Sequence, residues 1–232
     1  MAEHPPAAQI DVDWHDVVRF MRQLSHHLRH HLNAAELQAA YLNELAESAE
    51  MKEEVKRLRE MIAEVTKALQ SVTTKMVPVT AMPIPYRCAD LLEDIQQKLK
   101  SLGTTLEVDW DIEVGESMFE VDPQLLPEAI LELFGNAELH GGGDKKIKAA
   151  AKIENGEFEF TLREPQKQFN STTDNWGRVP LRQVGRGHYG LGLNRARMIV
   201  EAHGGRFNAE YDAGASNLLT RIVLPLAKPP SA

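Results

Sequence analysis

Three closely spaced glycines followed by a helical pattern are the most distinctive chemical feature of this sequence. Gly187, Gly190 and Gly192 precede a stretch in which apolar residues recur every three or four positions until Gly204-Gly205. This spacing predicts an amphipathic helix that begins at the glycines and ends at the glycine pair. Glycine tolerates unusual backbone dihedrals, and the first N–H groups of a helix lie at the positive end of its dipole without intrahelical acceptors. The pattern therefore predicts an anion site that suits a phosphate, and a flexible loop before a helix is the simpler alternative.

A second group of polar residues lies on a predicted helix from Leu126 to His140. Glu132 and Asn136 are four residues apart, so they share one face of that helix. The two polar side chains could therefore serve one site, and the alternative is a helix with an ordinary solvent-facing glutamate.

A third candidate, His26, lies near the start of the chain in a helical pattern. It is two residues from both Leu24 and Leu28, so at roughly 100° per residue it points away from the apolar stripe that these leucines belong to. Its imidazole can be neutral and nucleophilic near neutral pH. We therefore expect an exposed and nucleophilic histidine at this position.

Four histidines in this short segment also raise the question of a metal site. His26 with His30, and His27 with His31, are each spaced to lie on one helical face. No cysteine or acidic residue accompanies them at matching spacing. Adventitious binding of a divalent metal is therefore favoured over a dedicated zinc site.

The N-terminal third of the chain predicts a helical hairpin. No glycine or proline interrupts Val12 to Lys75, and two apolar stripes flank the polar stretch Glu47 to Glu54. A lone hairpin buries too little apolar surface, so two copies would form a four-helix bundle. We expect a disordered tail over residues 1–11 and a dimerisation hairpin over residues 12–77.

Prolines after Met76 mark a change to a second domain. We expect a linker over residues 78–89, a domain of mixed helices and strands over residues 90–226, and a tail over residues 227–232. Asn155-Gly156 predicts a tight turn between two strands. The fold class is therefore α+β: the helical hairpin is followed by an α/β sandwich with helices on one face of a mixed sheet.

Composition limits the classes of function. A formal charge of −8 disfavours a nucleic-acid partner, and a single cysteine, Cys88, excludes an intramolecular disulfide framework. No apolar run approaches the roughly 18 residues that span a bilayer, and the N-terminus lacks a signal-peptide pattern. We expect a cytoplasmic protein without direct membrane insertion, for which any sensing through a membrane would need a separate sensor protein.

Taken together and in this order, the motifs resemble the core of a sensor histidine kinase. The family joins a dimerisation and phosphoacceptor hairpin to an ATPase domain of the histidine-kinase (Bergerat) type. Ser25-His26-His27-Leu28-Arg29 resembles its H box, in which His26 aligns with the phospho-accepting histidine. Asn136-Ala137 resembles its N box, whose asparagine helps coordinate Mg²⁺ on the triphosphate. The nucleotide-binding glycine box is matched by Gly190, Leu191, Gly192 and Leu193.

Three departures from the family pattern bear on activity. His27 replaces the acidic residue that usually follows the phospho-accepting histidine, so we expect weaker autophosphorylation. Glu164 aligns with the aspartate that binds the adenine amino group, but the glycines that normally follow it are absent. Glu132 stands where gyrase-type relatives have a general base and many histidine kinases have asparagine, which implies that it could polarise an attacking group or hold the metal through a water molecule. The segment Asn170 to His188 is expected to form a lid over the nucleotide.

The resemblance implies a two-component signalling enzyme with ATP and Mg²⁺ as cofactors. The γ-phosphoryl group would pass to His26 and then to an aspartate on a response-regulator receiver domain. The first alternative is a non-catalytic histidine phosphotransferase or scaffold protein with a degenerate ATPase domain. The second, ATP hydrolysis without phosphotransfer, rests on Glu132 alone.

Overall fold

The structure is a computed structural model that describes residues 13–140, 146–166, 173, 176–181 and 189–227. The chain divides into two compact units, Met1–Val77 and Pro78–Ala232, which are described separately. Among the described residues, no helix is both long and apolar enough to cross a membrane.

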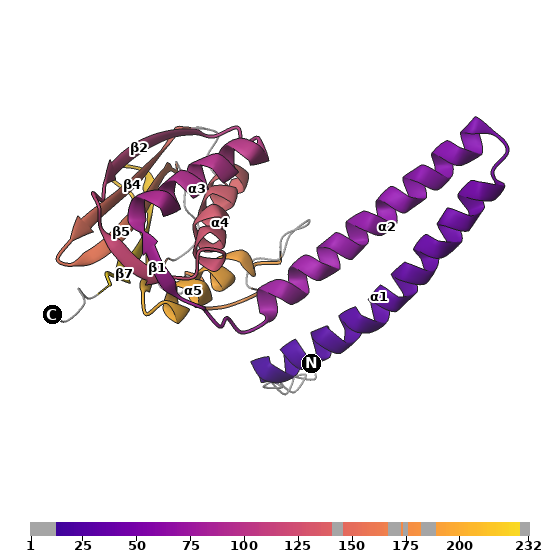
Figure 1. Cartoon of the computed structure of the whole chain (residues 1–232), viewed down its shortest axis with the longest axis horizontal. Helices are drawn as coiled ribbons and strands as arrows, with labels where there is room; N and C mark the ends of the chain where they lie inside the picture. Colours follow the sequence, from indigo (N-terminus) through magenta and orange to yellow (C-terminus); the bar gives the residue numbers. More distant parts are fainter. Residues whose placement is uncertain (1–12, 141–145, 167–172, 174–175, 182–188, 228–232) are drawn as a thin grey trace, which may run out of the picture. The chain divides into compact units, whose positions relative to one another are not determined.

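The first unit is an antiparallel pair of long helices (Figure 1). Helix α1 spans Trp14–Leu45 and helix α2 spans Ala49–Met76. Asp13 caps α1 by accepting a hydrogen bond from the His15 N–H at 2.6 Å, and Ser48 caps α2 by accepting one from the Met51 N–H at 3.1 Å. Each cap satisfies an N–H group that the helix itself leaves unpaired. The predicted hairpin is therefore confirmed.

The contact between the two helices uses a narrower set of residues than the apolar pattern suggested. The buried positions Val18, Ser25 and Ala39 on α1 are separated by seven and fourteen residues, and Ala46 in the turn continues the series after seven more. Seven residues complete two helical turns, so these positions form one seam along the helix. A second apolar set remains exposed, because each helix of an isolated pair can turn only one face to its partner. This set comprises Phe20, Leu24, Leu28, Leu37, Tyr41, Leu42, Leu45, Met51, Leu58, Met61 and Val65.

The second unit is a mixed five-stranded sheet of order β2-β4-β5-β7-β6 with a separate two-stranded sheet of β1 and β3. Only the β2–β4 pair is parallel; the other pairs are antiparallel. The α+β prediction is confirmed. Its strands are β1 (Ile84–Arg87), β2 (Glu107–Glu113), β3 (Met118–Val121), β4 (Lys146–Glu154), β5 (Glu157–Pro165), β6 (Arg206–Asp212) and β7 (Asn217–Pro225), and its helices are α3 (Cys88–Leu102), α4 (Leu125–His140) and α5 (Gly192–Ala202).

The three helices lie together on one side of the five-stranded sheet (Figure 1). Alternate residues of β5, Phe158, Phe160 and Leu162, are fully buried under them, as the period-two pattern of a half-buried strand requires. Phe134 of α4 packs 6.3 Å from Phe160, ring centre to ring centre. This single layer of helices on one face fixes α4 and α5 beside each other.

The structure differs from expectation at the start of this unit. Residues 78–89, expected as a linker, contain strand β1 and the first residues of α3. Strand β1 is short, includes Pro85 and pairs with β3, more than thirty residues further along the chain. Such non-local pairing leaves no local pattern in a four-residue segment. The predicted turn at Asn155-Gly156 is confirmed, with φ angles of 53° and 76°.

Candidate functional site

The glutamate predicted on α4 lies directly against the glycine that begins α5. A Cβ atom added to Gly192 would lie 1.6 Å from Oε1 and 2.4 Å from Cδ of Glu132. The carboxylate therefore occupies the space beside the amino end of α5, where the helix dipole favours negative charge. The sequence predicted that these two segments form one site, and the packing of α4 on α5 brings them together.

Asn136 lies one turn after Glu132 on the same helix and is partly buried. Its side-chain Nδ2 donates a hydrogen bond of 2.8 Å to the backbone carbonyl of Glu132. Because the helix engages the donor half of the amide, the acceptor half, Oδ1, is the atom suited to a metal ion. The Glu132 carboxylate and Asn136 Oδ1, one helical turn apart, are each oxygen donors of the kind that Mg²⁺ prefers.

The glycine segment before α5 has the conformation that its sequence predicts. Gly190 has a φ of 60°, and Leu191, which is buried, precedes the first helical residue. The Arg195 N–H closes the first turn on the Leu191 carbonyl at 2.9 Å. The N–H groups of Gly192 and Leu193 come before this closure and have no acceptor within the helix.

Glu164 lies at the end of β5, on the face that the helices cover. It is only 6 % exposed, and burial raises the pKa of its carboxyl to about 7, an effect that a hydrogen bond with Gln166 partly offsets. Strand β5 continues through Pro165, opposite Asn217 of β7. The Gln166 N–H then bonds the Ser216 carbonyl at 2.8 Å. Regular pairing thus extends to the position where the family has its first glycine loop.

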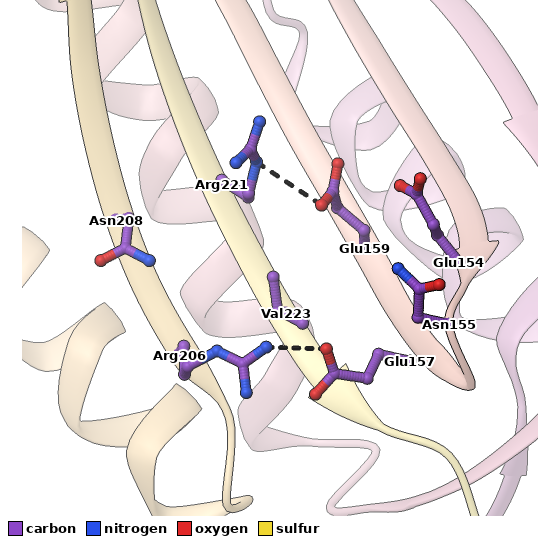
Figure 2. Close-up of a pocket in the computed structure, with 8 residues that line it drawn as sticks. All are labelled: Glu154, Asn155, Glu157, Glu159, Arg206, Asn208, Arg221 and Val223. Carbon is purple, nitrogen blue, oxygen red and sulfur yellow. Dashed lines mark hydrogen bonds and ion pairs between the residues drawn. The ribbon is translucent and has the colours of Figure 1, made fainter.

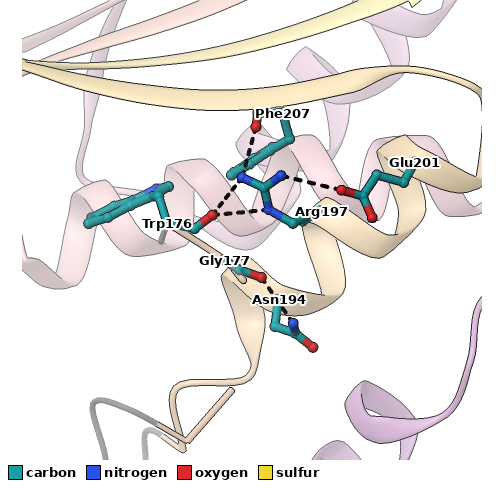
Figure 3. A network of polar contacts seen from close by, with 6 residues as sticks. All are labelled: Trp176, Gly177, Asn194, Arg197, Glu201 and Phe207. Atoms are coloured by element: carbon teal, nitrogen blue, oxygen red, sulfur yellow. Dashed lines mark hydrogen bonds and ion pairs between the residues drawn. The ribbon is translucent and has the colours of Figure 1, made fainter. Parts of the chain in front are cut away.

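Arg197 is a buried arginine of α5 that the sequence did not single out, and it binds the segment around Trp176 (Figure 3). Nε and Nη2 of Arg197 donate to the Trp176 carbonyl at 3.0 and 2.7 Å, and Nη2 also donates to the Phe207 carbonyl at 2.8 Å. Nη1 is 3.3 Å from a carboxylate oxygen of Glu201. The only sign of this network in the sequence was that an arginine falls among the positions of α5 that are buried.

Two further contacts hold the same segment. Nδ2 of Asn194 donates to the Gly177 carbonyl at 2.9 Å. Gly177 has a φ of 68°, and a Cβ there would lie 2.6 Å from the Leu193 carbonyl oxygen. Arg178 is exposed, whereas Arg182 and Arg186 of the expected lid lie outside the described residues. Trp176 and Gly177, which belong to the segment expected as a lid, thus contact the first turns of α5.

His203 at the end of α5 is a structural residue. Its Nε2 accepts the Asp122 N–H at 2.9 Å, and its Nδ1 is 2.7 Å from the Ile199 carbonyl oxygen. The Asp122 carboxylate in turn accepts the Leu125 N–H at the start of α4 at 3.1 Å and the Met82 N–H at 3.1 Å. Burial alone would raise the pKa of Asp122, but these hydrogen bonds hold it below its usual value. The network joins the ends of the two helices that form the site.

His26 lies on the exposed face of α1, in the other unit. Its Nε2 is 3.4 Å from Nε2 of His30, and the two rings meet edge to face. The preceding residue, Ser25, faces the helix seam. The exposure of His26 agrees with the sequence prediction. The leucines expected to form the seam, Leu24 and Leu28, are exposed, and Ser25 is buried instead.

A hollow away from these residues lies on the sheet face opposite the helices (Figure 2). It has a volume of about 190 Å³ and is lined by charged side chains of β5, β6 and β7. Arg206 bonds Glu157 at 2.7 Å and Arg221 lies 3.5 Å from Glu159, while Glu154 adds a further carboxylate. With its arginines paired and carboxylates in excess, this hollow does not suit a phosphate-bearing ligand.

No protein-family model matches the sequence, and no curated protein matches it. Solved structures are similar in fold. Full-length ShkA in complex with AMPPNP has a TM-score of 0.70 at 19 % identity, over 92 % of this chain and 47 % of that chain. The mycobacterial sensor histidine kinase MprB has a TM-score of 0.53 at 16 % identity, over 64 % of this chain and 100 % of that chain. The catalytic domain of histidine kinase ThkA has a TM-score of 0.52 at 15 % identity, over 62 % of this chain and 95 % of that chain.

This chain thus spans about half the length of ShkA. The similarity to ShkA extends over both the helical hairpin and the sheet-containing unit. It confirms the predicted fold class, an N-terminal helical hairpin followed by an α/β sandwich of the ATPase type named above.

Proposed function

We propose, because the chain has the fold of a sensor histidine kinase core, that it transfers the γ-phosphoryl group of ATP to His26. The single observation that carries the proposal is the contact between the Glu132 carboxylate and Gly192 at the amino end of α5, with Asn136 one turn away. Oxygen donors for a metal and a helix end for phosphates thus adjoin each other. The AMPPNP bound by ShkA is in keeping with a nucleotide at the same fold position.

Each proposed site residue would bind a different part of the nucleotide. Asn136 Oδ1 would hold Mg²⁺ on the triphosphate, and the Gly190–Leu193 backbone would bind phosphate oxygens. Glu164 would meet the adenine amino group. Magnesium would neutralise charge on the phosphates when bound, and most of the catalysis would be positioning.

The chemical step needs no oxidant or further reactant. A lone pair on an imidazole nitrogen of His26 attacks the γ-phosphorus, and the bond from that phosphorus to the bridging oxygen breaks. ADP leaves, and the proton on the other imidazole nitrogen passes to water. His27, which replaces the usual acidic residue, is uncharged in its neutral form and gives the developing imidazolium no negative partner. We therefore expect slow autophosphorylation.

The hairpin supports a second part of the proposal, a homodimer. The exposed apolar set of α1 and α2 forms more surface than the seam within one chain uses. Exposed apolar surface of this extent marks an interaction site, and a second hairpin of the same pattern would cover it as a four-helix bundle. We further propose that phosphorylated His26 donates to an aspartate of a response-regulator receiver domain.

One observation favours the alternative of a non-catalytic phosphotransfer or scaffold protein. Strand pairing of β5 with β7 continues to Pro165 and Asn217, and Gln166 is buried. A nucleotide base therefore has less backbone room beside Glu164 than a glycine loop provides. If this closes the base site, the hairpin and His26 would act without ATP.

Nucleotide binding and labelling separate these functions. Millimolar ATP·Mg²⁺ should raise the melting temperature of the wild-type chain, and Asn136→Ala should abolish the shift. Incubation with γ-labelled ATP should give acid-labile, base-stable label that is absent from His26→Gln. A thermal shift without label would support ATP binding or hydrolysis alone, and the absence of any shift would favour the scaffold. Label that persists in His26→Gln would exclude His26 as the acceptor.

A further inference from the structure

We propose that His26 and His30 form a binding site for Zn²⁺, and that an ion bound there prevents His26 from accepting a phosphoryl group. The inhibition of phosphoryl transfer rests on the proposed function, whereas the binding of zinc does not. The carrying observation is the distance of 3.4 Å between the two Nε2 atoms.

This distance fits a tetrahedral ion. Zinc–nitrogen bonds of about 2.0–2.1 Å at the tetrahedral angle place two ligand nitrogens about 3.3–3.4 Å apart. An octahedral or square-planar ion with the same bond lengths would need roughly 2.9 Å. The two rings meet edge to face with centroids 4.5 Å apart, so their Nε2 atoms already have the spacing that zinc needs. Rotation of an exposed ring about its side-chain bonds would then direct both lone pairs at one ion.

The position on α1 supplies the other requirements. Both side chains are exposed, so an ion can reach them, and they lie one turn apart within a 32-residue helix that fixes their backbones. Neutral imidazole is a ligand that zinc prefers over the harder cations Mg²⁺ and Ca²⁺.

Within the part of the chain that the structure describes, no group of three or more histidine, cysteine or acidic side chains forms a metal cluster. Water would therefore complete the coordination of an ion held by His26 and His30. Such a two-ligand site should have a dissociation constant on the order of 10 μM, far weaker than a four-ligand structural site.

Metal binding and phosphoryl transfer compete for the same electrons. The lone pair on Nε2 of His26 either coordinates zinc or attacks phosphorus, and it cannot do both. Zinc would thus act as a reversible inhibitor of this acceptor. His30 is the residue that distinguishes the two processes, because it binds the ion without accepting the phosphoryl group.

The binding half is tested by titrating ZnCl₂ into the metal-free full chain, followed by isothermal titration calorimetry. His30→Gln should weaken zinc binding at least about tenfold, because half the protein ligands are lost. His31→Gln is the matched control: it removes a histidine one residue away on the same exposed helix and should change affinity less than about twofold. Equal affinity in wild type and His30→Gln, or equal losses in both variants, would overturn the site. Far-UV circular dichroism checks that each variant keeps its helices.

The inhibitory half is tested by labelling with γ-labelled ATP at fixed excess Mg²⁺ with increasing ZnCl₂. Each variant is compared with its own metal-free labelling. The zinc concentration for half-inhibition should rise about tenfold in His30→Gln and stay unchanged in His31→Gln, which reports any competition of zinc with Mg²⁺. Equal sensitivity in all three proteins would overturn the inhibitory half. If metal-free wild type takes up no label, the kinase proposal fails, while the calorimetric result still decides the metal site.

Discussion

Replacing Arg197 by methionine should destabilise the second unit by about 3 kcal/mol, because the change removes every donor of a buried network and keeps most of the apolar stem. The carbonyls of Trp176 and Phe207 would each lose the guanidinium donors that now bond them. Hydrogen bonds from a charged group contribute roughly 1.5–3 kcal/mol each, and the contact with the Phe207 ring adds about 0.5–1. Burial opposes this: it lowers the pKa of Arg197, and the cost of desolvating the guanidinium places the expected net loss slightly below that sum.

Urea unfolding followed by tryptophan fluorescence measures this loss. In a Trp14→Phe background the signal comes from Trp110 and Trp176, both in the second unit. With a slope of about 2 kcal/mol/M, the midpoint should fall by roughly 1.5 M.

Arg206→Met is the control, because the Arg206 side chain is 60 % exposed and its ion pair with Glu157 lies at the surface, where such pairs stabilise a fold little. If the two variants unfold at midpoints within about 0.5 M of each other, the network does not stabilise the unit as argued.

Four other substitutions probe the site and the hairpin. Glu132→Gln removes a negative charge from the amino end of α5 and should raise ATP affinity several-fold by calorimetry while slowing labelling by about 10²–10⁴; weaker binding would contradict this. Gly192→Ala should displace the Glu132 carboxylate and slow labelling similarly, with less than about 1 kcal/mol lost in urea unfolding, because the far end of a flexible side chain can move aside. Glu164→Gln tests the pKa of about 7. Since the folded state holds this proton more tightly than the unfolded state, wild-type stability should fall from pH 4.5 to 7, and Glu164→Gln should flatten that dependence by up to about 3 kcal/mol. Ser25→Ala should raise the melting temperature of the hairpin, because the buried Ser25 hydroxyl has no hydrogen-bond partner among the described residues; a lower melting temperature would indicate a missed partner.

Local sequence patterns predicted the features that depend on interactions between residues close together in the chain. The absence of glycine and proline from Val12 to Lys75 predicted the helical hairpin, and Asn155-Gly156 predicted the turn between β4 and β5. Gly103 ends α3 in the left-handed conformation, as a glycine after an apolar helix predicts. Each of these outcomes depends on residues within one or two turns of chain.

Features that depend on a distant neighbour were not predictable in the same way. The apolar period of α1 shows that Leu24 and Leu28 share a stripe, but not that Val18 and Ser25 contact α2 instead. The expected apolar seam therefore matches only part of the set of residues that are buried within one chain. Arg197 is a similar case, because its role depends on carbonyls 10 and 21 residues away in the sequence.

Gly190 and Gly192 illustrate the same limit within one motif. The sequence argument treated both as residues needed for backbone freedom. Gly190 fits that argument, since its φ of 60° lies in the left-handed region that disfavours other residues. Gly192 opens a regular helix and needs no such freedom; its hydrogen leaves the space that the Glu132 carboxylate fills. One glycine shapes the loop and the other makes room for α4. Only the second therefore links the two motifs, so a side chain at 192 should affect chemistry through Glu132 and one at 190 through the loop itself.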